Sequence, residues 1–229
     1  IVGPTGYDST IKWVSAKENL PYKILFENDP DFATAPAQKV IIYLPIHPNL
    51  NPNALRIGDF GFGSFVFDVP PNTAAYTKRL DVRDSLGVFV DITAGVDIAN
   101  RRAFWIFESI DPATGLAATL PANAGFLPVN DSTKHDGEGF VTLMIQAASF
   151  TKTRDSISEQ ASIIFDVNEP LATNIESNLL DAVAPTSMIS SLPALIDTAF
   201  TIYWMGKDDS LGVGIQYYDL YVSKNNGPF

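Results

Sequence analysis

The sequence contains no cysteine, little histidine and no long apolar run, and each absence excludes a class of protein. Without cysteine the chain has no disulfide, no thiolate nucleophile and no cysteine-ligated metal. The longest apolar stretches, such as 40–44, have the length of a strand, which excludes a membrane-spanning helix. The only two histidines are His47 and His135, so the HExxH zinc motif is missing.

Basic residues are also scarce. The chain has 15 Lys and Arg against 26 Asp and Glu, a formal net charge of −11. Such a chain lacks the positive surface that binds nucleic acid or an anionic membrane, so neither is expected as a partner. The acidic residues are 19 Asp and only 7 Glu. Because Asp favours turns and Glu favours helices, this bias predicts a turn-rich β-protein.

The apolar content is high enough for a substantial core. Apolar residues make up 46% of the 229 residues and aromatic residues 11%, which excludes general disorder. Short β-branched and aromatic runs separated by turn residues predict strands at 22–27, 39–44, 64–69, 76–82, 87–93, 102–108, 139–145 and 159–166. Helical periodicity is weak and predicts only short helices at 178–183 and 192–198. We therefore expect an all-β sandwich.

No motif for catalysis is present. The sequence has no G-x-S-x-G nucleophile elbow, and the glycine-rich segment 58–63 does not match G-x-G-x-x-G. Bulges with glycine re-aim neighbouring side chains, so this segment predicts a bulged β-bend that lets Phe60, Phe62 and Phe65 pack. We expect no enzyme active site in this chain.

A boundary is predicted near the C-terminal end. Residues 182–186 are small and include Pro185, and we expect a linker there between a module at 1–181 and a second unit at 187–229. In the second unit, 200–204 and 215–223 alternate as strands do. Because the chain begins at Ile1 and ends in a turn at Phe229, we expect it to be a segment of a longer polypeptide.

Two groups of motifs resemble known extracellular repeats. Residues 20–28 and 34–40 are similar to the opening of conserved repeat modules of bacterial surface proteins. Residues 139–141, 161–170 and 173–174 resemble the A-x-I-x-F-D-x-N-x-P-x-x-T-N ending of Ig-like modules in large exported bacterial proteins. The resemblance implies an Ig-like β-sandwich over 1–181, located outside the cell on a bacterial surface.

The second unit resembles the first half of a fibronectin type III or related Ig-like module. The resemblance rests on Trp204, Gly206, 208–209, 212–214 and 218–223, with Val213 in place of the usual small residue. A full module has seven strands in about 100 residues, and the second unit is less than half that long. We expect the missing half to be supplied in the same polypeptide or by a neighbouring chain, through strand pairing at an exposed edge.

Calcium is the expected cofactor, because Ca²⁺ binds carboxylate, amide and carbonyl oxygens on flexible turns. The candidate ligands are Asp29 and Asp31, Asp166 and Asn168, and Asp208 and Asp209, with a further cluster at Asn130, Asp131 and Asp136. The alternative for each is turn capping, in which the side chain accepts hydrogen bonds from nearby backbone N–H groups.

The tryptophans raise the question of glycan binding, since sugars stack on flat rings. Trp105 and Trp204 lie in alternating strands and are expected to be buried, whereas Trp13 lies in a loop-like stretch and is the better candidate for a sugar platform. Neighbouring modules or subunits and cell-surface glycans are the expected partners.

Together these features predict a non-catalytic structural or adhesive module of a large secreted bacterial surface protein or extracellular filament. An accessory, polysaccharide-binding or spacer region of a secreted hydrolase is the alternative. A third, a small-molecule or lipid-binding sandwich, would require a cavity.

Overall fold

The computed structural model describes residues 1–118, 124–192, 199–223 and 227–228, and its regular structure is almost entirely β-strand. The strands are β1 (Trp13–Ser15), β2 (Leu20–Glu27), β3 (Lys39–Pro45), β4 (Leu50–Phe62), β5 (Phe65–Phe67), β6 (Ala75–Asp81), β7 (Phe89–Asp97), β8 (Arg102–Ile110), β9 (Glu138–Ala147), β10 (Ser156–Glu159), β11 (Ser162–Phe165), β12 (Leu171–Ala172), β13 (Glu176–Asp181), β14 (Thr186–Ile189) and β15 (Trp204–Lys207). The helix α1 (Arg83–Leu86) is one turn, closed by Gly87 at a φ of 73°. The described part of the chain holds no helix able to cross a membrane.

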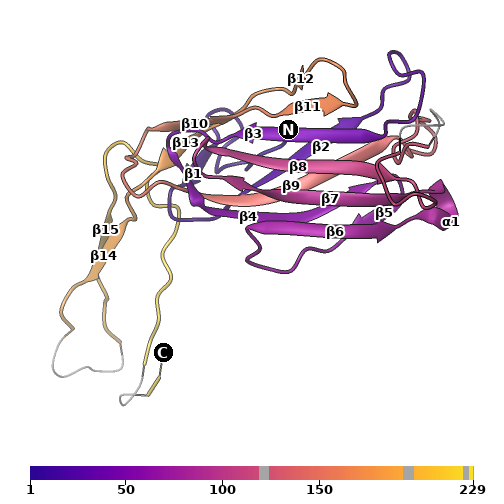
Figure 1. The fold of residues 1–229 in the computed structure, drawn as a ribbon. Helices are drawn as coiled ribbons and strands as arrows, with labels where there is room; N and C mark the ends of the chain where they lie inside the picture. The colour runs from indigo at the N-terminus through magenta and orange to yellow at the C-terminus, as the bar shows by residue number, and fades with distance from the viewer. Residues whose placement is uncertain (119–123, 193–198, 224–226, 229) are drawn as a thin grey trace.

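The larger sheet has six strands in the order β12-β11-β3-β8-β7-β6, with antiparallel neighbours (Figure 1). Its strands alternate between buried and partly exposed residues, as in β3, where Val40, Ile42 and Leu44 face inward. The predicted pair at 87–93 and 102–108 is confirmed as β7 and β8, joined by a turn in which Arg101 has a φ of 47°. Alternation of this kind is what a half-buried antiparallel sheet requires.

The second sheet has four strands in the order β2-β9-β4-β5. Its β4 is 13 residues long and was not among the predicted strands; only a bulged bend at 58–63 was expected there. Two register shifts against β9 interrupt it, one of them between Ile57 and Phe60. The bulged bend expected at 58–63 is therefore confirmed, and Phe60 and Phe62 are buried on its inner face.

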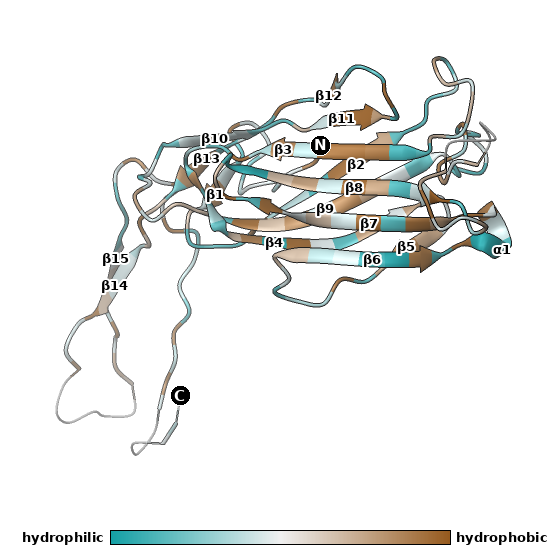
Figure 2. Ribbon diagram, viewed as in Figure 1, coloured by the Kyte–Doolittle hydropathy of each residue, from teal (hydrophilic) through white to brown (hydrophobic). Residues whose placement is uncertain are grey.

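The two sheets face each other across one hydrophobic core, which makes the fold an all-β sandwich (Figure 2). Phe107 of β8 lies 5.7 Å from Phe60 of β4 and 5.9 Å from Phe26 of β2, measured between ring centroids. Phe126, from the loop before β9, stacks on Phe107 at 5.8 Å. Each fully buried large apolar side chain contributes about 1.5–3 kcal/mol, so this aromatic cluster is a main source of stability.

A small third sheet closes one end of the sandwich. It has the order β1-β13-β10, with β1 parallel and β10 antiparallel to β13. The expected helix at 178–183 is wrong, because residues 176–181 form β13. Asn178 and Leu180 face inward, and the Asn178 amide donates to the carbonyls of Pro4 (3.0 Å) and Lys12 (2.9 Å), which only an extended segment can arrange here.

The predicted strand 159–166 is two strands in two different sheets. β10 ends at Glu159 and pairs with β13, whereas β11 begins at Ser162 and pairs with β3. Thr173 accepts from the backbone N–H of Ala161 (3.0 Å) at the crossing point. A chain that changes sheets in this way closes the end of a sandwich.

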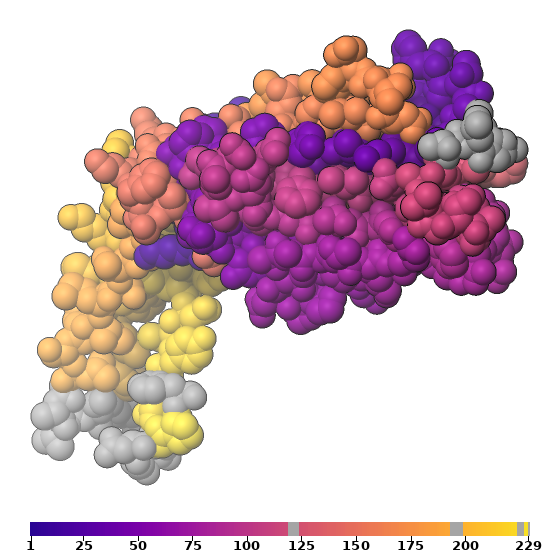
Figure 3. All heavy atoms as spheres, in the orientation of Figure 1, coloured from indigo at the N-terminus to yellow at the C-terminus, as the bar shows by residue number. Residues whose placement is uncertain are grey.

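The tail, of which residues 186–192, 199–223 and 227–228 are described, projects from one end of the sandwich (Figure 3). β14 and β15 pair only with each other among the described residues. The strand expected at 215–223 is absent from the structure, and only Trp204 of the strand expected at 200–204 lies in β15. The helix expected at 192–198 falls almost entirely outside the described residues.

Candidate functional site

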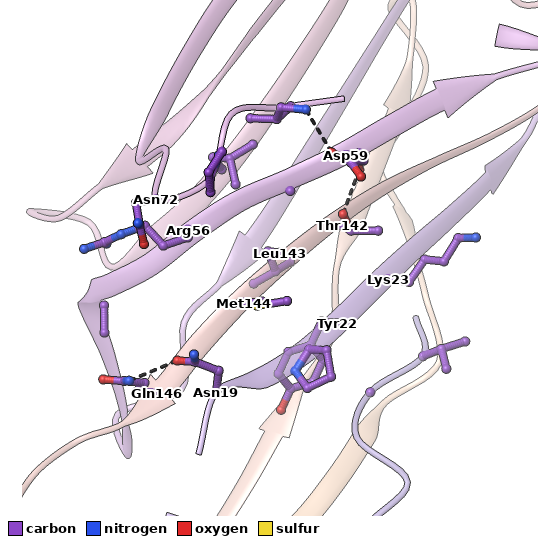
Figure 4. Close-up of a pocket in the computed structure, with 18 residues that line it drawn as sticks. Asn19, Tyr22, Lys23, Arg56, Asp59, Asn72, Thr142, Leu143, Met144 and Gln146 are labelled. Carbon is purple, nitrogen blue, oxygen red and sulfur yellow. Dashed lines mark hydrogen bonds between the residues drawn. The ribbon is translucent and has the colours of Figure 1, made fainter. Parts of the chain in front are cut away.

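An open groove lies on the outer face of the four-stranded sheet, away from the core (Figure 4). Its volume is about 750 Å³, and it crosses β2, β9 and β4. The polar side chains that line it are Asn19, Lys23, Arg56, Asp59, Asn72, Thr142 and Gln146. Cavities of 300–1,000 Å³ are the usual size for ligand sites, so this groove is the candidate site of the sandwich.

Glycine in β4 sets the depth of this groove. A side chain at Gly58 would place its Cβ 2.4 Å from the Thr142 hydroxyl. Because Gly58 has no side chain, Thr142 can approach β4 and donate its hydroxyl to the carbonyl of Asp59 at 2.8 Å. The bulge next to Gly58 is therefore part of the site, which is where bulges are often found.

The groove carries two cations and a row of amides. Lys23 Nζ lies 4.1 Å from the centroid of the Phe140 ring, a cation–π contact. Arg56 donates to the carbonyls of Asn53 (2.8 Å) and Leu55 (2.7 Å), and neither cation has a carboxylate within 4.0 Å among the described residues. Gln146 donates to the side-chain oxygen of Asn19 at 2.9 Å. Motif searching did not find this site, because its residues come from separate strands.

The expected calcium ligands lie on three separate turns. Asp29 accepts a hydrogen bond from the backbone N–H of Asp31 at 2.9 Å. Asp166 has a φ of 53°, and one of its oxygens accepts from the N–H groups of Gln38 (2.9 Å) and Lys39 (2.8 Å). Asn168 lies two residues further along, where its backbone N–H donates to the carbonyl of Phe165 at 3.0 Å. Asp29 thus accepts within its own turn, and Asp166 accepts from the backbone at the start of β3.

Asp208 and Asp209 lie at the base of the tail. Asp208 accepts from the N–H of Gly214 at 2.9 Å, and Asp209 accepts from the N–H of Leu211 at 3.2 Å and from the Thr153 hydroxyl at 2.7 Å. The Thr153 hydrogen bond lowers the pKa of Asp209 and links the tail to the sandwich. The six expected ligands are thus brought together only in their sequence pairs.

The fourth acidic cluster is also organised as a turn. Asp136 accepts from the N–H of Asp131 at 3.1 Å, and hydrogen bonds from Thr133 and Lys134 lower the pKa of Asp131 to about 2. Over the parts of the chain with described positions, no group of three or more His, Cys, Asp and Glu could hold a metal ion. Calcium binding remains a prediction.

Burial tests all three tryptophan expectations. Trp105 is fully buried in β8, as expected. Trp204 was expected in a core but is 51% exposed, because no second sheet covers the hairpin. Trp13 is only 8% exposed and packs in β1, so its ring offers no face to a sugar.

The tail surface is strongly apolar. Large side chains are exposed by roughly half to three-quarters of their area at Tyr203, Trp204, Met205, Tyr217, Tyr221 and Val222. Trp204 and Tyr218 form one edge-to-face contact, at 6.4 Å between ring centroids. Exposed large apolar side chains in such number are unusual on the surface of a monomeric domain.

A buried acid that the motifs did not identify lies at the end of β10. Glu159 is 1% exposed; one of its oxygens accepts from the N–H of His47 at 2.9 Å, and the other has no partner among the described residues. Burial raises the pKa of Glu159 to about 7, while His47 N–H and Arg101 oppose the shift. Its inward direction could have been read from the alternation Glu159, Ala161, Ile163.

The histidines have structural partners. His47 Nδ1 accepts from the N–H of Asn49 at 3.2 Å. His135 lies 2.6 Å from Glu138, which raises the pKa of His135 and lowers that of Glu138. Both contacts organise turns.

Comparisons with known proteins give limited matches. The model of a domain of unknown function (DUF7619) matches residues 119–179, less than half of the chain. No curated protein matches the sequence. The solved structures that match include BspA_C_WT and the Streptococcus agalactiae AgI/II polypeptide BspA C terminal domain (WT). Each is 14% identical with a TM-score of 0.40, and each match covers 77% of this chain and 46% of that structure. This chain spans less than half of their length, and at this similarity their properties do not transfer to it.

Proposed function

We propose that this chain is a non-catalytic structural and adhesive module of a large secreted bacterial surface protein, and that a neighbouring copy of the chain completes its tail. The closing motif at 161–174, which resembles that of exported Ig-like repeats, supports the extracellular setting. The contrast between a filled sandwich and an exposed apolar tail is the observation that carries the proposal.

The tail needs a partner for physical reasons. A two-stranded hairpin alone is marginally stable in water, and three or more strands over an apolar face are needed for independent stability. β14 and β15 have free edges among the described residues, and residues 215–223 alternate as a strand but pair with none. Adding a strand from a second copy would satisfy these backbone groups and cover the aromatic side chains.

Light scattering of the purified chain over a concentration series tests the proposal. We expect association that increases with concentration and that Tyr217→Ser with Tyr221→Ser reduces at least tenfold. The matched control is Phe32→Ser, which removes an aromatic ring that is 86% exposed on the sandwich. A monomer at every concentration would contradict the proposal.

An accessory region of a secreted hydrolase is the second candidate, and the polar groove favours it as much as it favours adhesion. The rest of the reading frame distinguishes the two candidate functions. A catalytic domain in the same reading frame would support the hydrolase, and an array of similar modules would support the surface protein.

A further inference from the structure

We infer that the groove on the outer face of β2, β9 and β4 binds an acidic oligosaccharide. The inference supplies a ligand for the adhesive role and rests on that proposed function for its biological setting only, because the groove and the tail are separate surfaces.

The position of the groove disfavours an extended peptide as its ligand. Peptides that add to a sheet use the free backbone groups of an edge strand. The groove lies on a sheet face, where β9 pairs with β2 on one side and with β4 on the other. The outer edge of β2 is also occupied, because Lys23 exchanges two 2.8 Å backbone hydrogen bonds with Val2. Side chains must therefore make the recognition.

The neutral side chains of the groove match sugar hydroxyls. Asn19 uses its oxygen to accept from Gln146, which leaves the Asn19 N–H donors and the Gln146 oxygen on the far sides of the pair, without a hydrogen bond among the described residues (Figure 4). Asn72, held at a φ of 62°, makes no side-chain hydrogen bond among the described residues. A carboxamide carries both donors and an acceptor, as neighbouring hydroxyls on a sugar ring do.

An apolar strip crosses the middle of the groove. Met144 is 52% exposed and stands directly opposite Pro21 on β2 and Arg56 on β4. Ligand sites combine apolar contact with a few placed polar groups, and here the strip would contact the C–H face of a sugar while the amides bind its edge.

Charge selects an acidic sugar. Lys23 and Arg56 stand on opposite sides of β9, on strands about 10 Å apart. The one carboxylate among the described lining residues, Asp59, accepts from the N–H of Val69 at 2.8 Å. The groove therefore has two cations and one acid, although the whole chain has a net charge of −11. Arg56 uses one nitrogen for its carbonyl contacts and keeps the rest of its planar fork, which suits a carboxylate.

Titration calorimetry with defined sugars tests the inference. The probes are a tetra-galacturonate, a sialylated trisaccharide and the neutral cellotetraose. We expect an acidic probe to bind, cellotetraose to bind at least tenfold more weakly, and affinity for the acidic probe to fall with added salt. If neither acidic probe binds, the inference is overturned.

Variants locate the site. Lys23→Gln with Arg56→Gln should reduce acidic-sugar affinity at least tenfold, and Asn19→Ala with Asn72→Ala should weaken all sugars. Lys78→Gln is the control, because it removes an equivalent exposed cation from β6 of the other sheet. Equal loss in the control would overturn the inference. Thermal unfolding identifies any variant that fails to fold. If a double variant fails to fold, Lys23→Gln alone, at an exposed position, is used to test acidic-sugar binding instead.

Two further controls separate alternatives. If a poly-glutamate peptide binds as tightly as the acidic sugar, the ligand is an acidic protein and the inference is wrong. The tail variant Tyr217→Ser with Tyr221→Ser should bind sugar normally. Loss of association without loss of sugar binding, or the reverse, shows which of the two proposals has failed.

Discussion

The sandwich and the tail contain the same kind of sequence and reach opposite states. Strand β8 alternates around Trp105, which is fully buried, and the tail alternates around Trp204, which is 51% exposed. Both segments have the aromatic and β-branched residues that favour strands. The difference is the second sheet, which covers β8 and is missing over the β14–β15 hairpin. Local pattern therefore specifies a strand face, and burial depends on whether another layer is present.

The largest expected effect compares the two tryptophans directly. Trp105→Ala should reduce the unfolding free energy by about 3–5 kcal/mol, because it leaves a large cavity in a filled core. Trp204→Ala should change it by less than about 0.5 kcal/mol in the dilute protein, as is usual for exposed positions. Urea denaturation measures both. Equal losses in the two variants would show that the tail is a packed part of the domain.

The next effect depends on pH and belongs to the sandwich alone. Since burial raises the pKa of Glu159 from 4.5 to about 7, the folded chain holds this proton more tightly than the unfolded chain. The unfolding free energy should therefore fall as pH rises from about 4.5 to 7, by an amount of the order of 3 kcal/mol at most, and level off above that range.

Glu159→Gln should remove this slope and be more stable than the parent at pH 8, since the amide still accepts from His47 and carries no buried charge. Denaturation at several pH values measures the difference between the variant and its parent. Glu169→Gln, at an exposed glutamate, is the control and should retain the slope. An unchanged slope in Glu159→Gln would show that another group is responsible.

The smallest effect concerns calcium, which would bind at turns. If Asp208 and Asp209 bind Ca²⁺ where the tail joins the sandwich, calcium at tenfold its Kd should stabilise the folded chain by about 1.4 kcal/mol. EDTA should lower the Tm, and Asp208→Asn with Asp209→Asn should remove the response. Asp29→Asn with Asp31→Asn tests a second of these turns in the same way. No shift on chelation would reject calcium binding.

Much of the sandwich could be predicted because its signals are local. Alternation in β2, β3, β7, β8 and β9 follows directly from period-two burial, and the bulge at 58–63 was indicated by its glycines. The first half of β4 was missed because Asn51, Pro52 and Asn53 look like a turn, and tertiary pairing with β9 overrides that preference.

The site was less predictable. Residue types alone nominated Asp29, Asp166 and Asp208, and each accepts hydrogen bonds from backbone N–H groups, Asp29 and Asp208 within a turn and Asp166 at the start of β3. The groove depends on the register of three strands, which places Lys23 opposite Thr142 and Arg56 opposite Met144. Register of this kind is set by long-range pairing, so single-sequence patterns do not contain it.

Hydrogen exchange of the tail as a function of protein concentration tests most directly whether the sandwich is complete and the tail needs a second copy. We expect peptides covering 199–223 to exchange rapidly in the dilute protein and to gain protection as concentration rises, while β8 stays protected throughout. A tail that is protected even at high dilution, or that remains unprotected at every concentration, would contradict the proposal.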